Sequence, residues 1–331
     1  MQAKADELFV ATQSRTWRDA LLAIDEESGA CSEIVFASDV APEVFAALMS
    51  RHDALPKSMR YDAHTREVVV SDLAHPRHGI PIMKFSGLAE IYSRAQGGRR
   101  APPAPGDFSF LGDLSMHLGG SVRAPDATMQ PRNSATTTPV LVVEVGASES
   151  VAQLDDDAQV YLGCPLLNGE VQAVLIIRVF KRRPSPTAHG AVPGPYAAVA
   201  ALYVRGNGPG AGRTQALAEV PGAAGPVFVV PTAPSCVISF GSAPVHAGPC
   251  RAQVEGLGTA PTGVGFGGPA CDRLGLAAYR IRVPAAVLYF ASPPPAGMLA
   301  AAVPDATNDW TIDLYEFVEA LDTAVAFRAG E

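Results

Sequence analysis

Two acidic residues, Asp126 and Glu144, are the strongest candidates for chemistry in this sequence. Asp126 ends the stretch GGSVRAPD, and Glu144 interrupts the apolar run PVLVVEVG eighteen residues later. A carboxylate within an apolar strand is costly to bury unless it is paired or binds a metal. Two carboxylates at the ends of neighbouring strands would offer the oxygen ligands that Mg²⁺ prefers. A metal held there can generate a hydroxide and stabilise charge on a phosphoryl group.

The acidic residues around this pair have structural as well as functional readings. The three consecutive acids 155–157 fall near the start of an expected helix, where acids commonly complement the helix dipole. Asp157 is spaced to share a helical face with Leu154 and Tyr161, so we expect it to point inward more than its two neighbours. Asp126 would also suit a simple turn.

Hydrophobic periodicity predicts the elements that must position these residues. Helical spacing predicts helices over 41–52, 82–92 and 150–162, and again from Trp310 to Leu321. We expect the second of these helices to place four apolar residues on one face, namely Ile82, Phe85, Leu88 and Ile91. Apolar runs predict strands over 108–111, 122–129, 140–145, 171–180 and 196–204, and a hairpin that joins 59–61 to 68–70.

The run 140–145 is the most informative strand, because it is apolar at every position except Glu144. Such a run is typical of a strand that is buried on both faces. Side chains alternate along a strand, so Leu141, Val143 and Val145 should face away from Glu144. This strand is therefore expected at the centre of a sheet.

Composition and charge bound the classes of function. Hydrophobic residues make up 48% of the 331, which is ample for a folded core. The net charge of −8 counts against avid, nonspecific binding to nucleic acid. Residues 51–132, however, hold eleven Lys and Arg against eight Asp and Glu, a local balance of 11 − 8 = +3. A local basic groove therefore remains compatible with the sequence.

Cysteine spacing and hydropathy indicate an intracellular protein, cytoplasmic or nuclear. The five cysteines include no CxxC pair, which argues against a zinc site or a disulfide framework. The N-terminus lacks the apolar run of a secretory signal. Pro and Gly interrupt every apolar stretch before it reaches the length needed to span a membrane. We expect no membrane partner, and the sequence leaves the oligomeric state open.

The ordered motifs resemble the PD-(D/E)XK nuclease superfamily. The order is a hairpin, a helix, a strand ending in Pro-Asp, a strand carrying Glu, a helix and a further strand. The phrases VEVGASES, LDDDAQVYL and GEVQAVLII are similar to restriction-endonuclease-like proteins abundant in cyanobacteria, and more so to eukaryotic, especially fungal, relatives. The resemblance covers about half of the chain and matches Asp126 and Glu144 to the two catalytic acids that bind Mg²⁺.

One position departs from this family pattern. The resemblance implies a lysine two residues after the second acid, where this chain has Gly146. Cyanobacterial relatives often carry the lysine in the following helix, but here no lysine occurs between Lys84 and Lys181. Arg123 or Lys84 could supply part of the missing positive charge, although arginine cannot be deprotonated and suits only the electrostatic part.

The expected fold is therefore α/β (α+β), a restriction-endonuclease-like core with a mixed central sheet flanked by helices. We expect an N-terminal extension over 1–40, this core over 41–206, and a Gly/Pro-rich, β-rich C-terminal elaboration over 207–331.

Two functions follow from the resemblance. The first is a Mg²⁺-dependent nuclease, a hydrolase of phosphodiesters, with Asp126 and Glu144 as catalytic residues and metal ligands. Asp157, Arg123 and Lys84 would be auxiliary, and nucleic acid would be the partner. The second is an inactive nuclease fold with a degenerate site, which serves as a binding or assembly module for a protein partner.

Overall fold

A computed structural model describes fifteen segments of the chain, and the statements below concern these residues alone. The segments are 2–12, 34–49, 59–62, 65–70, 76–97, 108–112, 116–118, 121–132, 138–147, 149–163, 171–181, 194–205, 214–216, 229–289 and 309–329.

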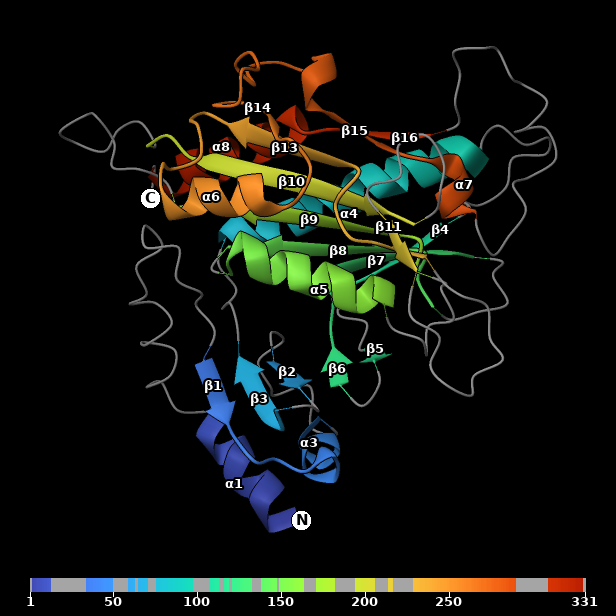
Figure 1. Cartoon of the computed structure of the whole chain (residues 1–331), viewed down its shortest axis with the longest axis vertical. Helices are drawn as coiled ribbons and strands as arrows, with labels where there is room; N and C mark the ends of the chain where they lie inside the picture. Colours follow the sequence, from blue (N-terminus) through green and yellow to red (C-terminus); the bar gives the residue numbers. More distant parts are fainter. Residues whose placement is uncertain are drawn as a thin grey trace.

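The chain is a mixed α/β protein with two main sheets (Figure 1). The five-stranded sheet has the order β1-β3-β2-β6-β5 and comprises Ile34–Ala37, Glu67–Val70, Met59–Asp62, Ser121–Arg123 and Met116–Leu118. The seven-stranded sheet has the order β14-β13-β10-β9-β8-β7-β4 and comprises Thr262–Gly263, Cys236–Gly241, Ala197–Val204, Ala173–Val179, Leu141–Gly146, Ala127–Pro131 and Phe108–Leu111. Two small pairs complete the strands, β11 (Thr214–Ala216) with β12 (Val229–Pro231) and β15 (Arg280–Val283) with β16 (Trp310–Asp313).

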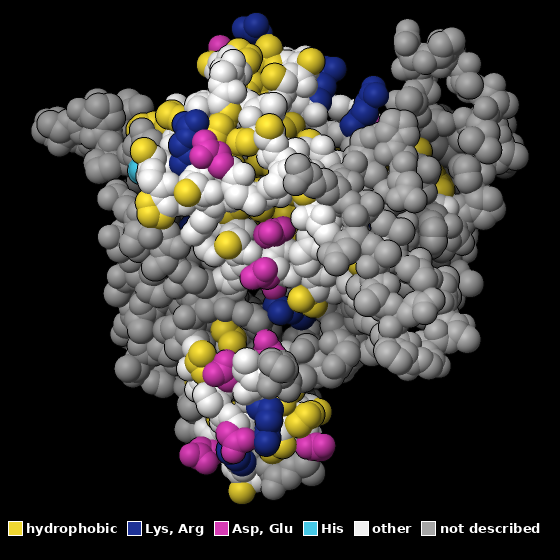
Figure 2. Space-filling model, viewed as in Figure 1, with side chains coloured by type: hydrophobic (Ala, Val, Ile, Leu, Met, Phe, Trp, Pro, Cys, Tyr) yellow, Lys and Arg dark blue, Asp and Glu magenta, His cyan; other side chains and the backbone are white. Residues whose placement is uncertain are grey.

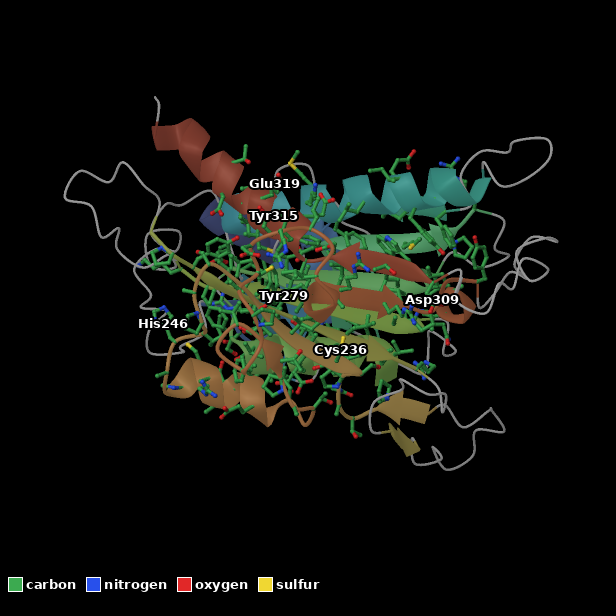
Figure 3. The ribbon with its side chains drawn as sticks, turned by 90° about the horizontal axis from the view of Figure 1, so that it is seen from above. Cys236, His246, Tyr279, Asp309, Tyr315 and Glu319 are labelled. Atoms are coloured by element: carbon green, nitrogen blue, oxygen red, sulfur yellow. The ribbon has the colours of Figure 1, made fainter. Side chains whose placement is uncertain are left out.

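Helices cover both faces of the seven-stranded sheet. Residues of α4 (Pro76–Gly97), α7 (Ala285–Leu288) and α8 (Tyr315–Ala329) pack on one face, and those of α5 (Val151–Gly163) and α6 (Pro249–Gly256) pack on the other. In Figure 3, Tyr315 and Glu319 mark α8 on one side of the sheet, while His246 lies toward α6. The helices α1 (Gln2–Thr12) and α3 (Pro42–Met49) belong with the five-stranded sheet, and a 3-10 turn, η4, spans Ala277–Tyr279. The mixed sheet flanked by helices confirms the expected fold class.

The strand β8 lies between β7 and β9 at the centre of this sheet. It runs parallel to β9 and antiparallel to β7. Leu141, Val143 and Val145 join the apolar cluster beneath α4 and α8, whereas Val142 joins the cluster beneath α5. The predicted alternation is confirmed, and it places Glu144 on the α5 face of the sheet.

Several predicted elements are confirmed, and two helices and one strand need correction. The hairpin forms as β2 and β3, and the helices predicted over 41–52 and 150–162 form as α3 and α5. The helix predicted over 82–92 is longer and spans Pro76–Gly97. Ile91 was expected on its apolar face but is 67% exposed, because the buried face of the helix carries Phe85 and Ala89. The helix predicted from Trp310 is preceded by a strand, since Trp310 begins β16 and α8 starts only at Tyr315.

The strand predicted over 122–129 is divided between the two sheets. Val122 and Arg123 end β6 in the five-stranded sheet, and Ala127 begins β7 in the seven-stranded sheet. Pro125 lies between them, and a proline has no N–H to donate to a continuing strand ladder. The expected turn at Gly119-Gly120 lies outside the described residues. The break matters for the site, because it sets Arg123 and Asp126 at the junction of the sheets.

The seven-stranded sheet crosses the boundary expected between residues 206 and 207. The strand β13 pairs with β10 over six residues, and β14 pairs with β13. Gly263 in β14 has a φ of +92°, and a Cβ there would lie 2.1 Å from the carbonyl oxygen of Ser239. Only glycine permits so close an approach of the two strands.

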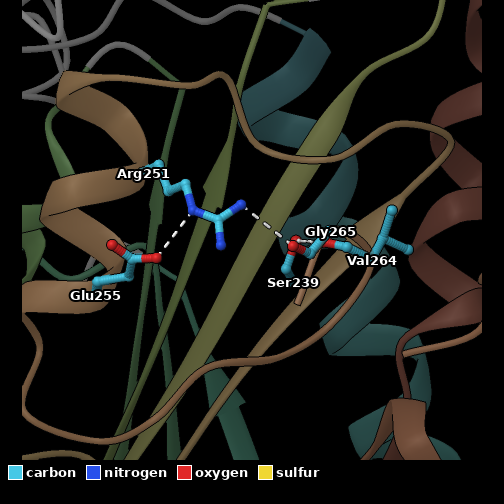
Figure 4. Close-up of polar contacts among 5 residues, drawn as sticks. All are labelled: Ser239, Arg251, Glu255, Val264 and Gly265. Atoms are coloured by element: carbon cyan, nitrogen blue, oxygen red, sulfur yellow. Dashed lines mark hydrogen bonds and ion pairs between the residues drawn. The ribbon is translucent and has the colours of Figure 1, made fainter. Parts of the chain in front are cut away.

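A side-chain clamp fixes the segment that follows β14 (Figure 4). Arg251 of α6 donates from Nη1 to the carbonyl of Gly265 at 3.2 Å and pairs through Nε with Glu255 at 2.8 Å. Its guanidinium also lies 4.5 Å from the ring centroid of Phe266. These contacts tie the segment after β14 to α6. Among the described residues, no helix combines the length and the apolar character that crossing a membrane requires.

Candidate acidic site at the junction of the two sheets

Asp126 and Glu144 are brought together by the pairing of β7 with β8. Ala127 lies opposite Val143 at the end of this antiparallel ladder, and Asp126 immediately precedes Ala127. Asp126 is close enough to Glu144 for its charge to act on the Glu144 carboxyl. The Oδ2 atom of Asp126 accepts a hydrogen bond from the backbone N–H of Val145 at 2.6 Å, which fixes the carboxylate against β8.

The helix α5 lies over this pair and contributes two side chains. Its first turn is fixed by Ser150, whose Oγ accepts from the N–H of Gln153 at 3.1 Å. One face then carries Asp157 and, four residues on, Tyr161. The hydroxyl of Tyr161 donates to Oε1 of Glu144 at 2.6 Å. Asp157 lies inward, with 14% of its side chain exposed, as predicted. Asp155 also lies inward, where it accepts from Tyr203, so of the three consecutive acids only Asp156 is exposed.

Arg123 reaches the same place from the five-stranded sheet. Its Nη1 forms an ion pair with Oδ1 of Asp157, and only 12% of its side chain is exposed. The Nε atom of Arg123 is buried without a hydrogen-bond partner among the described residues. On the face shown in Figure 2, acidic side chains lie over α5 with a basic group beside them where the two sheets meet. The site therefore depends on both sheets.

The electrostatics of this group centre on Glu144. Burial raises the pKa of Glu144 well above its ordinary value of 4.5, and the charges of Asp126 and Asp157 raise it further. Glu149 adds a smaller effect in the same direction, whereas the hydrogen bond from Tyr161 acts in the opposite direction. Burial and the nearby Glu144 also raise the pKa of Tyr161, so its hydroxyl keeps the proton that it donates. A positive charge bound beside these acids would therefore stabilise the ionised form of Glu144.

The raised pKa of Glu144 predicts that this residue destabilises the fold as the pH rises. The folded state retains a proton that the unfolded state releases above about pH 4.5, so the free energy of unfolding falls as the pH rises toward the folded pKa. Glu144→Gln cannot titrate and should therefore gain stability relative to wild type across this window. A single proton can change the free energy of unfolding by at most about 1.4 kcal/mol for each pH unit.

Urea unfolding of both proteins between pH 4.5 and 8 measures this difference. Asp156→Asn is the matched control, because Asp156 is exposed on the same helix. We expect its stability to follow that of wild type at every pH. Parallel curves for wild type and Glu144→Gln would show that Glu144 ionises as easily in the folded as in the unfolded chain.

The structure does not bring Lys84 to this site. Lys84 lies on α4, whose buried residues pack on the opposite face of the sheet, and it pairs with Glu316 of α8. The auxiliary role expected for Lys84 is therefore not supported by its position. Of the two basic residues proposed to replace the missing lysine, Arg123 is the one at the acids.

The position of the missing lysine is itself crowded. Gly146 lies on the α5 face, and a Cβ added there would be 2.7 Å from Cδ1 of Leu154 and 3.2 Å from Oε2 of Glu149. The φ of Gly146 lies outside the left-handed range, so crowding rather than backbone strain limits this position. Its lateral neighbour in the parallel pair with β9 is Arg178.

Sequence reasoning missed two polar groups on this face of the sheet, the hydroxyl of Tyr161 and the guanidinium of Arg178. Tyr161 was expected to share the inner face of its helix with Leu154 and Asp157, but the hydrogen bond from its hydroxyl to Glu144 was not expected. Arg178 is 4% exposed within a strand that is otherwise apolar, the same signal that singled out Glu144. Its guanidinium lies over the ring of Phe180 at 5.1 Å. Strand alternation would have placed it on the Glu144 face.

The carboxylates of this site offer oxygen ligands of the kind that a hard divalent cation binds, but too few to form a complete protein cage. Among the described residues, no group of three or more His, Cys, Asp or Glu side chains is arranged to hold a metal ion. Asp126 and Glu144 supply carboxylate oxygens, and Mg²⁺ commonly binds through one or two carboxylates plus waters and substrate oxygens. Two protein ligands therefore fit Mg²⁺ better than a metal that needs a complete protein cage.

Comparisons with known proteins show a distant structural likeness. No family model and no curated protein matches the chain. Among solved structures, the chain is similar to one described as "a putative nuclease belonging to DUF820" from Anabaena variabilis ATCC 29413. The TM-score is 0.29 at 11% sequence identity, and the match covers 44% of this chain and 71% of that chain. A likeness this distant gives no information about the site of this chain.

Proposed function

We propose that the protein is a Mg²⁺-dependent phosphodiesterase of the endonuclease type, with a site that is degenerate at Gly146. The observation that supports this most is geometric: Asp126 is held against β8, Glu144 accepts from Tyr161, and Asp157 pairs with Arg123 at one place. Burial and the neighbouring acids also raise the pKa of Glu144. Acids arranged at such a cost to stability are more common at functional sites than elsewhere. The resemblance of the strands around Asp126 and Glu144 to the PD-(D/E)XK superfamily points to phosphodiesters as the substrate class.

In this proposal Asp126 and Glu144 hold the metal. A bound Mg²⁺ would supply a water of lowered pKa and would offset charge on the phosphoryl group. Arg123 would stabilise the negative charge of the phosphate, and Asp157 would hold its guanidinium in place. Arginine stays protonated, so Arg123 would contribute electrostatics and not proton transfer. Nucleic acid is the proposed substrate.

One observation favours the second function, an inactive fold that serves as a binding or assembly module. Leu154 and Glu149 occupy the space that a side chain at position 146 would need. A site that once used a lysine there would have closed around the glycine. In that case the acidic group persists without turnover, and the partner would be another protein.

Calorimetric titration with Mg²⁺ and with Mn²⁺, followed by cleavage assays on DNA and RNA, separates the two functions. We expect wild type to bind one Mn²⁺ and to cleave at least one nucleic acid when Mg²⁺ is present. Glu144→Ala should abolish both, because it removes one of the two metal ligands. Asp156→Asn is the control and should behave as wild type, since Asp156 is exposed on the same helix.

Three results would count against the proposal. Wild type that binds neither metal and cleaves neither nucleic acid would exclude the phosphodiesterase. Cleavage that persists in Glu144→Ala would place the chemistry elsewhere in the chain. Metal binding without cleavage would favour the inactive module.

A further inference from the structure

The hydrogen bond between Tyr161 and Glu144 is the most specific contact in the acidic site. The hydroxyl of Tyr161 donates to Oε1 of Glu144 at 2.6 Å. Tyr161 is 1% exposed, and its ring packs in the cluster between α5 and the sheet. Packing of this kind leaves the hydroxyl few alternative positions, so the carboxylate of Glu144 is held in one orientation.

A second tyrosine on the same face of the sheet provides an internal comparison. Tyr203 of β10 donates its hydroxyl to Oδ1 of Asp155 at 2.5 Å, and it is fully buried. Asp155 lies on α5, two residues before Asp157, yet it is not among the charges that raise the pKa of Glu144. Among the described residues, α5 thus takes part in two tyrosine–carboxylate hydrogen bonds to the sheet, and only that of Tyr161 involves a proposed metal ligand.

We propose that Tyr161 is a positioning residue for Glu144, which fixes the carboxylate so that Oε2 is presented to a divalent cation beside Asp126. This inference rests on the proposed function. Groups that hydrogen-bond to metal ligands orient those ligands and tune the affinity of the site. With Oε1 engaged by Tyr161, Glu144 would bind the cation through one oxygen.

Two physical effects of the hydroxyl favour metal binding together. Because Tyr161 already holds the carboxylate in one orientation, Glu144 loses less conformational entropy when it binds the cation. A hydrogen bond to a carboxylate also stabilises its charged form, which is the form that binds a metal. Removing the hydroxyl should therefore weaken metal binding through both effects. A merely structural tyrosine would change the stability and leave the metal affinity unaltered.

Titration of Mn²⁺ into Tyr161→Phe tests this inference, with Tyr203→Phe as the matched control. Both variants keep a buried aromatic ring and lose one hydroxyl that donates to a carboxylate. We expect Tyr161→Phe to weaken Mn²⁺ binding about 10-fold or more, in line with other changes to groups that support metal ligands. Tyr203→Phe should bind Mn²⁺ as wild type does, and urea unfolding of both variants reports any loss of stability.

The outcomes separate this inference from the proposed function. Wild type that binds Mn²⁺, with Tyr161→Phe binding equally well, overturns the positioning role and leaves the phosphodiesterase proposal standing. Equal weakening in both variants also overturns it, because the effect would then be structural. Wild type that binds neither Mn²⁺ nor Mg²⁺ overturns the positioning role, and it also excludes the phosphodiesterase when neither nucleic acid is cleaved.

A measurement on wild type covers the case in which Tyr161→Phe does not fold. Tyrosine labelled with ¹³C at Cζ gives one NMR signal for each ring, and Mg²⁺ should shift the signal of the tyrosine bonded to Glu144. The shift should be absent in Glu144→Gln. Tyrosine signals that stay unchanged while Mg²⁺ binds would overturn the inference.

Discussion

Leu141→Ala is expected to lower the free energy of unfolding by about 2–5 kcal/mol, the usual range for removing a buried leucine side chain. Leu141 is fully buried in β8. It lies opposite Met129 of β7 on one side and Ala173 of β9 on the other, so neighbours on both strands prevent collapse into the cavity. Urea denaturation of wild type and variant at one pH measures the difference.

Leu111→Ala is the control for this change. Leu111 ends the edge strand β4 and is 40% exposed, so the same substitution there removes far fewer contacts. We expect it to cost less than about 1 kcal/mol. If Leu141→Ala also cost less than about 1 kcal/mol, β8 would not be the centre of the core.

The sequence predicted β8 well because one strong signal dominated it. A continuous apolar run between turn residues can be buried on both faces, and alternation then assigns every side chain to a face. Glu144 follows from the same argument, since an acid in such a run needs a partner. The structure supplies Tyr161 as that partner, and the charges of Asp126 and Asp157 act on the same carboxyl.

The face on which a helix packs could not be predicted in the same way. The spacing of Phe85 and Ala89 shows that α4 has a buried side, but nothing in that spacing tells which face of the sheet it covers. Lys84 was therefore a reasonable candidate for the site until α4 was found on the opposite face, where it pairs with Glu316.

The junction between the two sheets, where Arg123 and Asp126 lie, also could not be predicted from the sequence. Residues 122–129 have the apolar pattern of one strand, yet β6 and β7 separate at Pro125. A local pattern does not report that two halves of a run join different sheets, because the partners that decide it are distant in sequence. Arg123 ends β6 in one sheet, and Asp126, three residues on, immediately precedes β7 of the other sheet.

Gly146→Lys is the change with the largest expected effect on activity. Lysine at 146 would place an ammonium two residues after Glu144 on the same face of β8, where it could orient a water and offset the acids. Its Cβ would lie 2.7 Å from Cδ1 of Leu154, so Leu154 must move, and we expect a loss of stability of about 1–3 kcal/mol. We expect the variant to fold and to gain, or increase, Mg²⁺-dependent cleavage of a plasmid.

The crowding at Gly146 also determines the controls. Gly146→Met adds a side chain of similar length without charge, so it reproduces the displacement of Leu154 and should give no gain. Combining Gly146→Lys with Glu144→Ala should erase any gain, because the ammonium would then act beside an incomplete metal site. The double variant Gly146→Lys, Leu154→Ala frees space for the new Cβ and so shows whether crowding limits the effect of the lysine.

If all lysine variants fold and none cleaves, while wild type is also inactive, the site has lost more than one functional group. The chain would then be better described as a binding module that retains its acids for their interactions with Arg123 and Tyr161.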